Sequence, residues 1–98
     1  MVTQGDIIKM CEISYPLLVV SKNTYNASGH LIACPIVPQD TGSALCVYIE
    51  SSLISGYVLC DNPRQFDWQA RGFSSQDRIP LSKQIFVLDM IQSLFDYI

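Results

Sequence analysis

Residues 55–72 of this sequence read SGYVLCDNPRQFDWQARG. An apolar run, Tyr57–Cys60, leads into the turn former Pro63, and polar and apolar residues then alternate from Arg64 to Trp68. Alternation of this kind predicts a strand with one solvated face, and the apolar run predicts a buried strand before it. The stretch therefore predicts two strands joined by a turn that carries Asp61.

Further strands are expected on the N-terminal side of this stretch. Continuous apolar runs suit strands buried on both sides, and clusters of turn-forming residues separate them at 23–29 and 37–43. The expected strands are Ile7–Cys11, Leu17–Val20, His30–Ile36 and Leu45–Glu50.

The last fifth of the chain changes to helical periodicity after Pro80, and Ser82 is the expected N-cap of this helix. We interpret its apolar stripe as a surface that packs on the core, and the alternative is a surface that forms a groove for a partner. Phe86 and Met90 lie outside the stripe and are candidates for an interface. The stripe contains Leu81, Gln84, Leu88, Ile91 and Phe95, flanked by Ile85, Val87, Leu94 and Ile98, with Asp89, Ser93 and Asp96 on the opposite side.

Several short strands followed by one helix predict a mainly β (α+β) fold, a small and partly open SH3-like barrel with a C-terminal helix. The 98 residues suit a single domain, 1–98. Periodicity alone leaves other α+β layouts open.

The composition is poor in charge. Hydrophobic residues make up 49% of the chain and charged residues 15%, below the quarter or so that is usual in soluble chains. Burial of part of this apolar surface between copies would explain the excess of apolar residues, so a homodimer is favoured. The alternative is a chain whose apolar residues fill its own core beneath an ordinary mixed surface. The net charge is -3 and the basic residues are scattered, which argues against a duplex-binding surface and leaves room only for a local nucleic-acid site.

The four cysteines are Cys11, Cys34, Cys46 and Cys60, and they form no Cys-x-x-Cys pair. This spacing predicts no metal site, and no cofactor is expected. Each cysteine lies in an apolar run, so we expect buried free thiols, which are typical of a reducing cytoplasm. A signal peptide and a membrane-length apolar run are not found, and a cytoplasmic protein without membrane contact is predicted.

Three stretches resemble the toxins of the MazF/PemK/Kid family. Gly5-Asp6-Ile7-Ile8 is similar to the family's first strand, and residues 16–21, followed by Tyr25-Asn26, are similar to its second strand and the next turn. The most specific match is residues 55–72, where Kid and PemK toxins have Gly-Val-Val, an Asp-Gln-Pro-Arg step, an Asp and a closing Ala-Arg-Gly.

The resemblance implies a homodimer of CcdB/Kid/MazF-like barrels that cleaves single-stranded RNA at short sequences without a metal and is neutralised by a cognate antitoxin protein. In metal-free cleavage the ribose 2′-hydroxyl attacks the adjacent phosphate. That reaction needs a base near the hydroxyl, an acid near the leaving oxygen and a cation on the phosphate.

Carried over residue by residue, the resemblance makes Asp61 the base and Arg64 the phosphate-binding cation. Arg71, Asp67 and Trp68 become candidate RNA contacts, with Trp68 able to stack on a base. The structural alternatives are a turn cap for Asp61, pairing with Asp67 or carbonyl capping for the two arginines, and a half-buried barrel side chain for Trp68.

The chain also departs from the family pattern. The loop before Pro16 is short, and Tyr15 stands where the family has Arg. Val37 occupies the position of a Thr or Ser in the family, and Leu59 occupies the position of an Arg in Kid. Glu12 could replace a loop carboxylate, although a solvated loop charge is the alternative.

His30 opens a strand away from the motif and receives no catalytic role. Two functions therefore stay open: an endoribonuclease with a weakened site, and a non-catalytic member that binds an antitoxin or poisons a protein by contact, as CcdB-type gyrase inhibitors do. A third possibility is a family member that still folds but has lost its activity.

Overall fold

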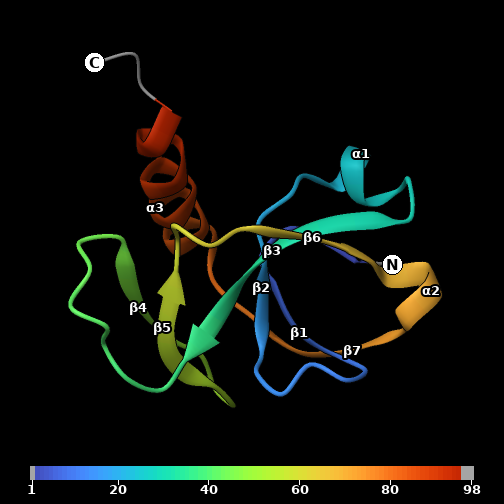
Figure 1. Cartoon of the computed structure of the whole chain (residues 1–98), viewed down its shortest axis with the longest axis horizontal. Helices are drawn as coiled ribbons and strands as arrows, with labels where there is room; N and C mark the ends of the chain where they lie inside the picture. The colour runs from blue at the N-terminus through green and yellow to red at the C-terminus, as the bar shows by residue number, and fades with distance from the viewer. Residues whose placement is uncertain (1, 96–98) are drawn as a thin grey trace.

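An antiparallel sheet curls into an open half-barrel in the computed structural model, which describes residues 2–95 (Figure 1). The strands are β1 (Asp6–Met10), β2 (Leu17–Val19), β3 (His30–Val37), β4 (Cys46–Glu50), β5 (Ser55–Leu59), β6 (Arg64–Asp67) and β7 (Phe73–Arg78). The helices are α1 (Asn23–Asn26), α2 (Trp68–Arg71) and α3 (Leu81–Gln92), the last continuing into a 3-10 turn at Ser93–Phe95. This arrangement confirms the predicted barrel with its C-terminal helix.

The long strand β3 organises the sheet. The strand order is β4-β5-β3-β2-β1-β7, and β6 also pairs with β3. One half of β3 pairs with β5 through Ile36 and Val37, and the other half pairs with β6 from His30 to Ala33. Because β5 and β6 lie along the same strand, the turn between them, which carries Asp61, is held beside the middle of β3.

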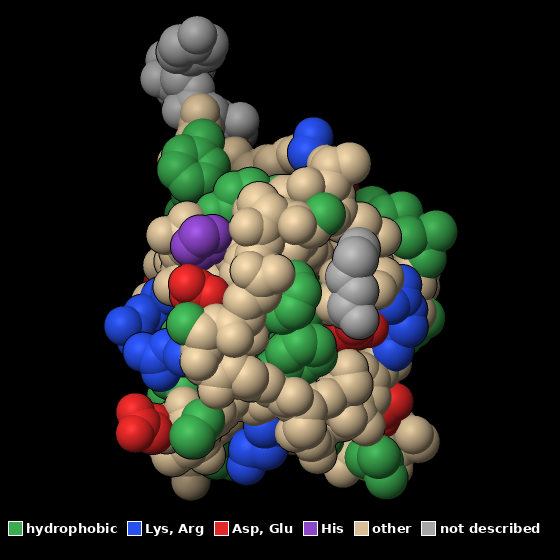
Figure 2. Space-filling model, turned by 90° about the vertical axis from the view of Figure 1, so that its right-hand side faces the viewer, with side chains coloured by type: hydrophobic (Ala, Val, Ile, Leu, Met, Phe, Trp, Pro, Cys, Tyr) green, Lys and Arg blue, Asp and Glu red, His purple; other side chains and the backbone are tan. Residues whose placement is uncertain are grey.

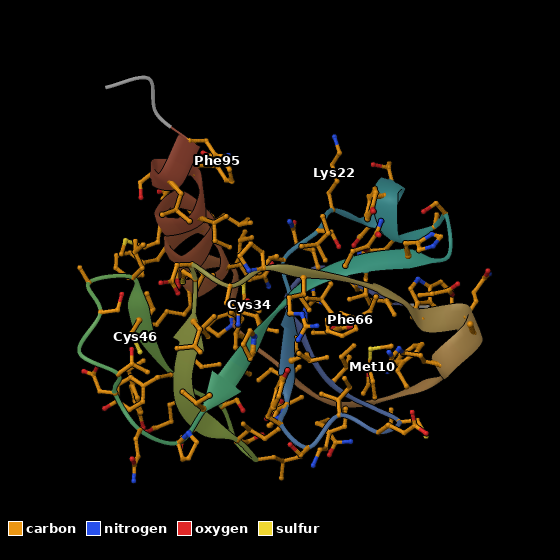
Figure 3. The ribbon with its side chains drawn as sticks, in the orientation of Figure 1. Met10, Lys22, Cys34, Cys46, Phe66 and Phe95 are labelled. Carbon is orange, nitrogen blue, oxygen red and sulfur yellow. The ribbon has the colours of Figure 1, made fainter. Side chains whose placement is uncertain are left out.

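Two apolar clusters lie on opposite faces of the curled sheet, because successive residues of β1 and β2 belong to different clusters. In the first, Val87 of α3 packs with side chains from the sheet. The second includes Phe66 of β6 and Met10 of β1 (Figure 3) together with Leu31 of β3. The first cluster contains Ile7, Leu18, Val20, Cys34, Ile36, Val47, Ile49, Val58, Cys60, Ile79 and Val87. The second contains Val2, Ile8, Met10, Leu17, Val19, Leu31, Ala33 and Phe66.

Gly5, at the start of β1, lets α3 approach the sheet. Its φ angle is +92°, and a Cβ atom placed there would lie 2.2 Å from Nε2 of Gln84. The Gln84 side chain is buried and donates a hydrogen bond from Nε2 to the carbonyl of Ile79 at 2.9 Å. Glycine is therefore required here for its backbone conformation and for space.

Two elements differ from the sequence-based expectation. The strand expected to end at Trp68 ends at Asp67, where the chain enters the short helix α2. Strand β7 was not predicted, and it forms because its backbone pairs with β1 along its whole length. Its polar sequence, FSSQDR, carries no alternation that would mark it as a strand.

Helix α3 corrects three expectations. Pro80 is its N-cap, and Ser82 lies inside the first turn, so the predicted Ser82 cap was wrong. Leu81 is 68% exposed, whereas Val87, which we placed beside the stripe, is the buried contact. Met90 packs against the first cluster and Phe86 is half exposed. Ile98, predicted beside the stripe, and Asp96, predicted on the opposite side, lie outside the described residues.

The cysteines fall into two groups. Cys34 and Cys60 are buried free thiols, as predicted, and Cys46 is partly buried. Cys11 is exposed, so its predicted burial was wrong. It follows β1 directly and lies in the turn to β2, where the chain has left the core.

Candidate functional site

Asp61 lies in the tight turn that follows β5. The N–H of Asn62 donates to the carbonyl of Leu59 at 3.1 Å, and the N–H of Cys60 donates to the carbonyl of Leu45 at 3.0 Å. Cys60 is buried, and its hydrogen bond anchors the start of the turn in the core. The Asp61 side chain is exposed and has no hydrogen-bond or ion-pair partner within residues 2–95. Its carboxylate is thus held outward and is not used to cap the turn.

Two buried thiols lie beneath this turn. Burial, followed by the neighbouring Cys60 and Asp61, raises the pKa of Cys34 to about 12. Burial, followed by Cys46 and Asp61, raises the pKa of Cys60 to about 11. Both thiols stay protonated at neutral pH, and buried thiols of this kind are inert as nucleophiles. The candidate chemistry therefore lies with the exposed Asp61.

Two arginines converge on Phe66. The guanidinium carbon of Arg64 lies 5.9 Å from the centre of the Phe66 ring, and that of Arg71 lies 6.0 Å from it. The arginines come from β6 and α2, and both are exposed while Phe66 is buried. Neither forms an ion pair within the described part of the chain, so the alternative of pairing with Asp67 is not observed. The two cations are available to a phosphate.

Asp67 joins β6 to α2 and faces His30. One carboxylate oxygen accepts a hydrogen bond from the backbone N–H of Ala70 at 2.9 Å, which caps α2. The other lies 3.9 Å from Nε2 of His30, because β3 and β6 place the two residues directly opposite each other. The expectation that His30 lies away from the motif was therefore wrong. Figure 2 shows the histidine beside an acidic side chain, with basic side chains adjoining them.

Trp68 is partly buried and fixed on two sides. Its indole N–H donates to the carbonyl of Asn26 at 2.9 Å, and its ring packs edge-on against Phe73 with the centroids 5.7 Å apart. Trp68 as a whole is of intermediate exposure. Trp68 thus ties α2 to α1 and β7, and its use as a stacking surface stays a prediction.

The positions that depart from the family pattern lie on the sheet and its first loop. Val37 ends β3 opposite Tyr57, Leu59 ends β5 opposite Cys46, and all four side chains are partly buried. Tyr15 packs against the second apolar cluster. None of these side chains is a cation that could hold a phosphate.

Glu12 occupies the tightest part of the loop between β1 and β2. Its φ angle is +68°, and the N–H of Ile13 donates to the carbonyl of Met10 at 3.2 Å, which closes a four-residue turn around it. The side chain is exposed. A shallow hollow of about 320 Å³ lies nearby, where β1 and β7 meet directly after Arg71, and it is lined by Lys9, Met10, Cys11, Gly72, Phe73 and Ser74.

Neither a metal-binding cluster nor a membrane-spanning helix is found within residues 2–95. No group of three or more His, Cys, Asp or Glu side chains is arranged to hold a metal ion there. No helix in that range is long and apolar enough to cross a membrane.

The fold and the exposed site define a small antiparallel half-barrel with a C-terminal helix. Solved structures share this fold. A chain of the MazE–MazF crystal structure from Deinococcus radiodurans matches with a TM-score of 0.87 and 28% identity over 96% of this chain and 95% of that chain. MazF from the same organism matches with a TM-score of 0.83 and 26% identity over 96% of both chains.

An endoribonuclease in complex with its cognate antitoxin from a mycobacterial species shares the fold, with a TM-score of 0.77 and 20% identity over 96% of this chain and 97% of that chain. A search among curated proteins found no match. The family model for PemK-like, MazF-like toxins of type II toxin–antitoxin systems matches residues 12–95. The chain belongs to this toxin family.

Proposed function

We propose that this protein is a toxin that binds single-stranded RNA along β6 and α2 and cleaves it slowly without a metal. The observation that carries the proposal is the pair of exposed arginines, Arg64 and Arg71, that meet at Phe66 without a carboxylate partner in the described chain. Guanidinium groups bind phosphate oxygens in a bidentate manner. The exposed Asp61 precedes this pair along the chain and supplies a carboxylate.

In the proposed reaction Asp61 takes the proton of a ribose 2′-hydroxyl, whose oxygen attacks the adjacent phosphorus. The phosphorus–O5′ bond breaks, and the leaving 5′ oxygen takes a proton from water, so the products are a 2′,3′-cyclic phosphate and a 5′-hydroxyl. Arg64 stabilises the charge on the phosphate. Arg71, Asp67 and the accessible part of Trp68 contact the rest of the RNA strand.

The side chains that replace the family's polar groups explain why cleavage should be slow. Tyr15, Val37 and Leu59 supply neither the second cation nor the small hydroxyl that the family resemblance implies. Loss of a positioned acid lowers a rate by a factor of about 10²–10⁴, and loss of a charge-stabilising donor by about 10²–10³. We therefore expect an activity that is measurable but weak.

We further propose that the toxin acts in the cytoplasm as a homodimer and is neutralised by a cognate antitoxin. Solved relatives include a MazE–MazF complex. Helix α3 and the turn after it expose apolar side chains, which suits a protein–protein interface. These side chains are Leu81, Ile85, Phe86, Leu94 and Phe95. Light scattering coupled to size-exclusion chromatography should give the mass of two chains, and a mass of one chain would contradict the dimer.

Expression in a bacterial host with sequencing of RNA 5′ ends tests the activity. We expect growth arrest and new sequence-specific ends, both lost in Asp61→Ala and Arg64→Ala. Asp40→Ala is the matched control, because Asp40 is also exposed but lies in the loop before β4. Cleavage of a synthetic RNA by the purified protein in the presence of a chelator tests metal independence.

The apolar replacements at Val37 and Leu59 favour one alternative, a member of the family that acts by contact without chemistry. Growth arrest without new RNA ends would contradict the nuclease and support a contact poison. Tight binding to an antitoxin without growth arrest would support an inert binder.

A further inference from the structure

His30 and Asp67 face each other on one side of the β3–β6 ladder. Directly opposed residues of antiparallel strands point to the same side of the sheet, and the ladder places these two residues opposite each other. Nε2 of His30 lies 3.9 Å from the Asp67 carboxylate, and the side chains are 45% and 47% exposed. The pair is therefore accessible to a ligand from solvent.

This pair adjoins the proposed RNA-binding residues. Asp67 ends the strand that begins with Arg64, and it caps the helix whose last residue is Arg71. Arg64 and Phe66 point to the opposite face of β6 from Asp67, and both arginines lie over Phe66. An RNA strand held by both arginines therefore has to pass around β6 to reach the Asp67 carboxylate, which repels phosphates. Figure 2 shows the histidine with an acidic side chain beside it and basic side chains below them.

The charged and titratable groups around His30 come from three elements. Asp67 on β6 is its only charged contact within residues 2–95. Arg71 on α2 is turned to Phe66, and the hydroxyl of Tyr25 on α1 accepts a hydrogen bond from Gln65 at 2.6 Å. Lys22, which precedes α1, points away into solvent (Figure 3). The charge beside Asp67 is thus set by His30.

We propose that His30 and Asp67 are a pH-dependent phosphate-contact site for single-stranded RNA. With His30 neutral, the pair carries one negative charge and repels the RNA backbone. With His30 protonated, the pair is neutral and the imidazolium N–H groups can donate to a phosphate oxygen. The RNA affinity of the toxin therefore rises on acidification. This inference rests on the RNA binding proposed above.

Histidine is the side chain whose ordinary titration falls in the neutral range, and the chain contains one. Fluorescence anisotropy with a labelled oligouridine, whose bases do not titrate between about pH 5.5 and about pH 8, isolates the effect. The Asp61→Asn background prevents cleavage during the measurement. One added phosphate contact should tighten binding about threefold to tenfold at low salt as the pH is lowered through this range.

Two variants test the residues separately. His30→Gln keeps a polar side chain that does not titrate, and it should make the affinity independent of pH. Asp67→Asn removes the negative charge but keeps an oxygen that can cap α2. It should therefore bind about threefold more tightly than the parent protein at about pH 8. Circular dichroism and size-exclusion chromatography establish that both variants are folded.

The outcomes separate this inference from the proposed function. Binding that depends on Arg64 and Arg71, with a pH dependence that survives in His30→Gln, would overturn the role of His30 alone. An unchanged affinity of Asp67→Asn at about pH 8 would do the same. Absence of RNA binding by the parent protein at both pH values would instead overturn the proposed function, and the inference with it.

Discussion

The turn after β2 and the turn after β5 use similar polar side chains for opposite purposes. After β2, Ser21 and Asn26 are buried, and the amide nitrogen of Asn26 donates to the carbonyl of Ser21 at 3.0 Å. The Ser21 hydroxyl bonds to the Asn26 side-chain oxygen and accepts from the N–H of Ile32 at 2.8 Å. After β5, Asp61 and Asn62 are exposed.

The difference separates polar groups that hold the fold from those available for chemistry. A buried polar side chain must be hydrogen-bonded, because leaving it unpaired costs about 1–3 kcal/mol per group. Asn26 meets this demand through its two side-chain bonds to Ser21, whose hydroxyl in turn accepts from the N–H of Ile32 on β3. The exposed Asp61 carboxylate is satisfied by water and can be removed with little effect on stability. Removal of polar side chains from each turn tests this distinction.

The largest effect is expected for Asn26→Ala. The substitution removes the side-chain bonds to Ser21 and leaves the Ser21 hydroxyl and carbonyl without those partners in the core, at a cost of about 3–4 kcal/mol in the free energy of unfolding. Urea denaturation followed by circular dichroism measures this change. Asn62→Ala, in the exposed turn, is the matched control and should lie within about 0.5 kcal/mol of the parent protein. Equal losses in the two variants would contradict the distinction.

A smaller loss is expected for Gly5→Ala, which tests the contact between β1 and α3. The substitution combines a strained positive φ with overlap of the new Cβ and the Gln84 side chain, and we expect a loss of about 2 kcal/mol. Gly42→Ala is the control, because Gly42 also has a positive φ, +83°, but a Cβ there meets nothing within 4 Å. Its loss should be about 1 kcal/mol. A smaller loss at Gly5 than at Gly42 would show that α3 is not held by this contact.

The sequence predicted the parts of the fold that local pattern determines. The strands around Asp61 and the helix after Pro80 follow from apolar runs, alternation and helical spacing. Strand β7 could not be predicted, because its polar residues form a strand only through pairing with β1. Edge strands of this kind depend on tertiary context more than on propensity.

The candidate site was likewise predicted only where its residues lie close together in the sequence. Asp61, Arg64 and Arg71 lie within one stretch of sequence, so a local resemblance was enough to select them. His30 lies far from Asp67 in the sequence, and only the register of β3 with β6 brings the two residues together. That register was not available from the pattern of either strand. The buried role of Asn26 was missed because a turn-forming composition does not indicate that this side chain bonds to Ser21 inside the core.

The smallest effect in this series is expected at Asp77, which is accessible and yet well partnered. Its carboxylate accepts hydrogen bonds from the Ser52 hydroxyl at 3.1 Å and from the N–H groups of Leu53 at 3.0 Å and Arg78 at 2.8 Å. The Ser51 hydroxyl, followed by the N–H groups of Arg78 and Leu53, lowers the pKa of Asp77 to about 2. These contacts tie the turn between β4 and β5 to β7.

A lowered pKa in the folded state means that ionised Asp77 stabilises the fold. This contribution is fully present above the ordinary pKa of 3.8 and is lost as the pH falls through about 2. Asp77→Asn should therefore be less stable than the parent protein near neutral pH, and its loss of stability between about pH 4 and about pH 2 should be shallower. Thermal unfolding measured across this range tests the expectation, and Ser52→Ala, which removes one contact, should give an intermediate slope.

Asp77 also sharpens the comparison of the two turns, because its side chain is hydrogen-bonded, as that of Asn26 is, and yet is partly exposed to solvent. Water replaces the lost partners at an exposed site, so Asp77→Asn should cost much less than Asn26→Ala. A loss as large as that of Asn26→Ala would show that the number of partners, and not burial, determines how much a polar side chain stabilises this fold.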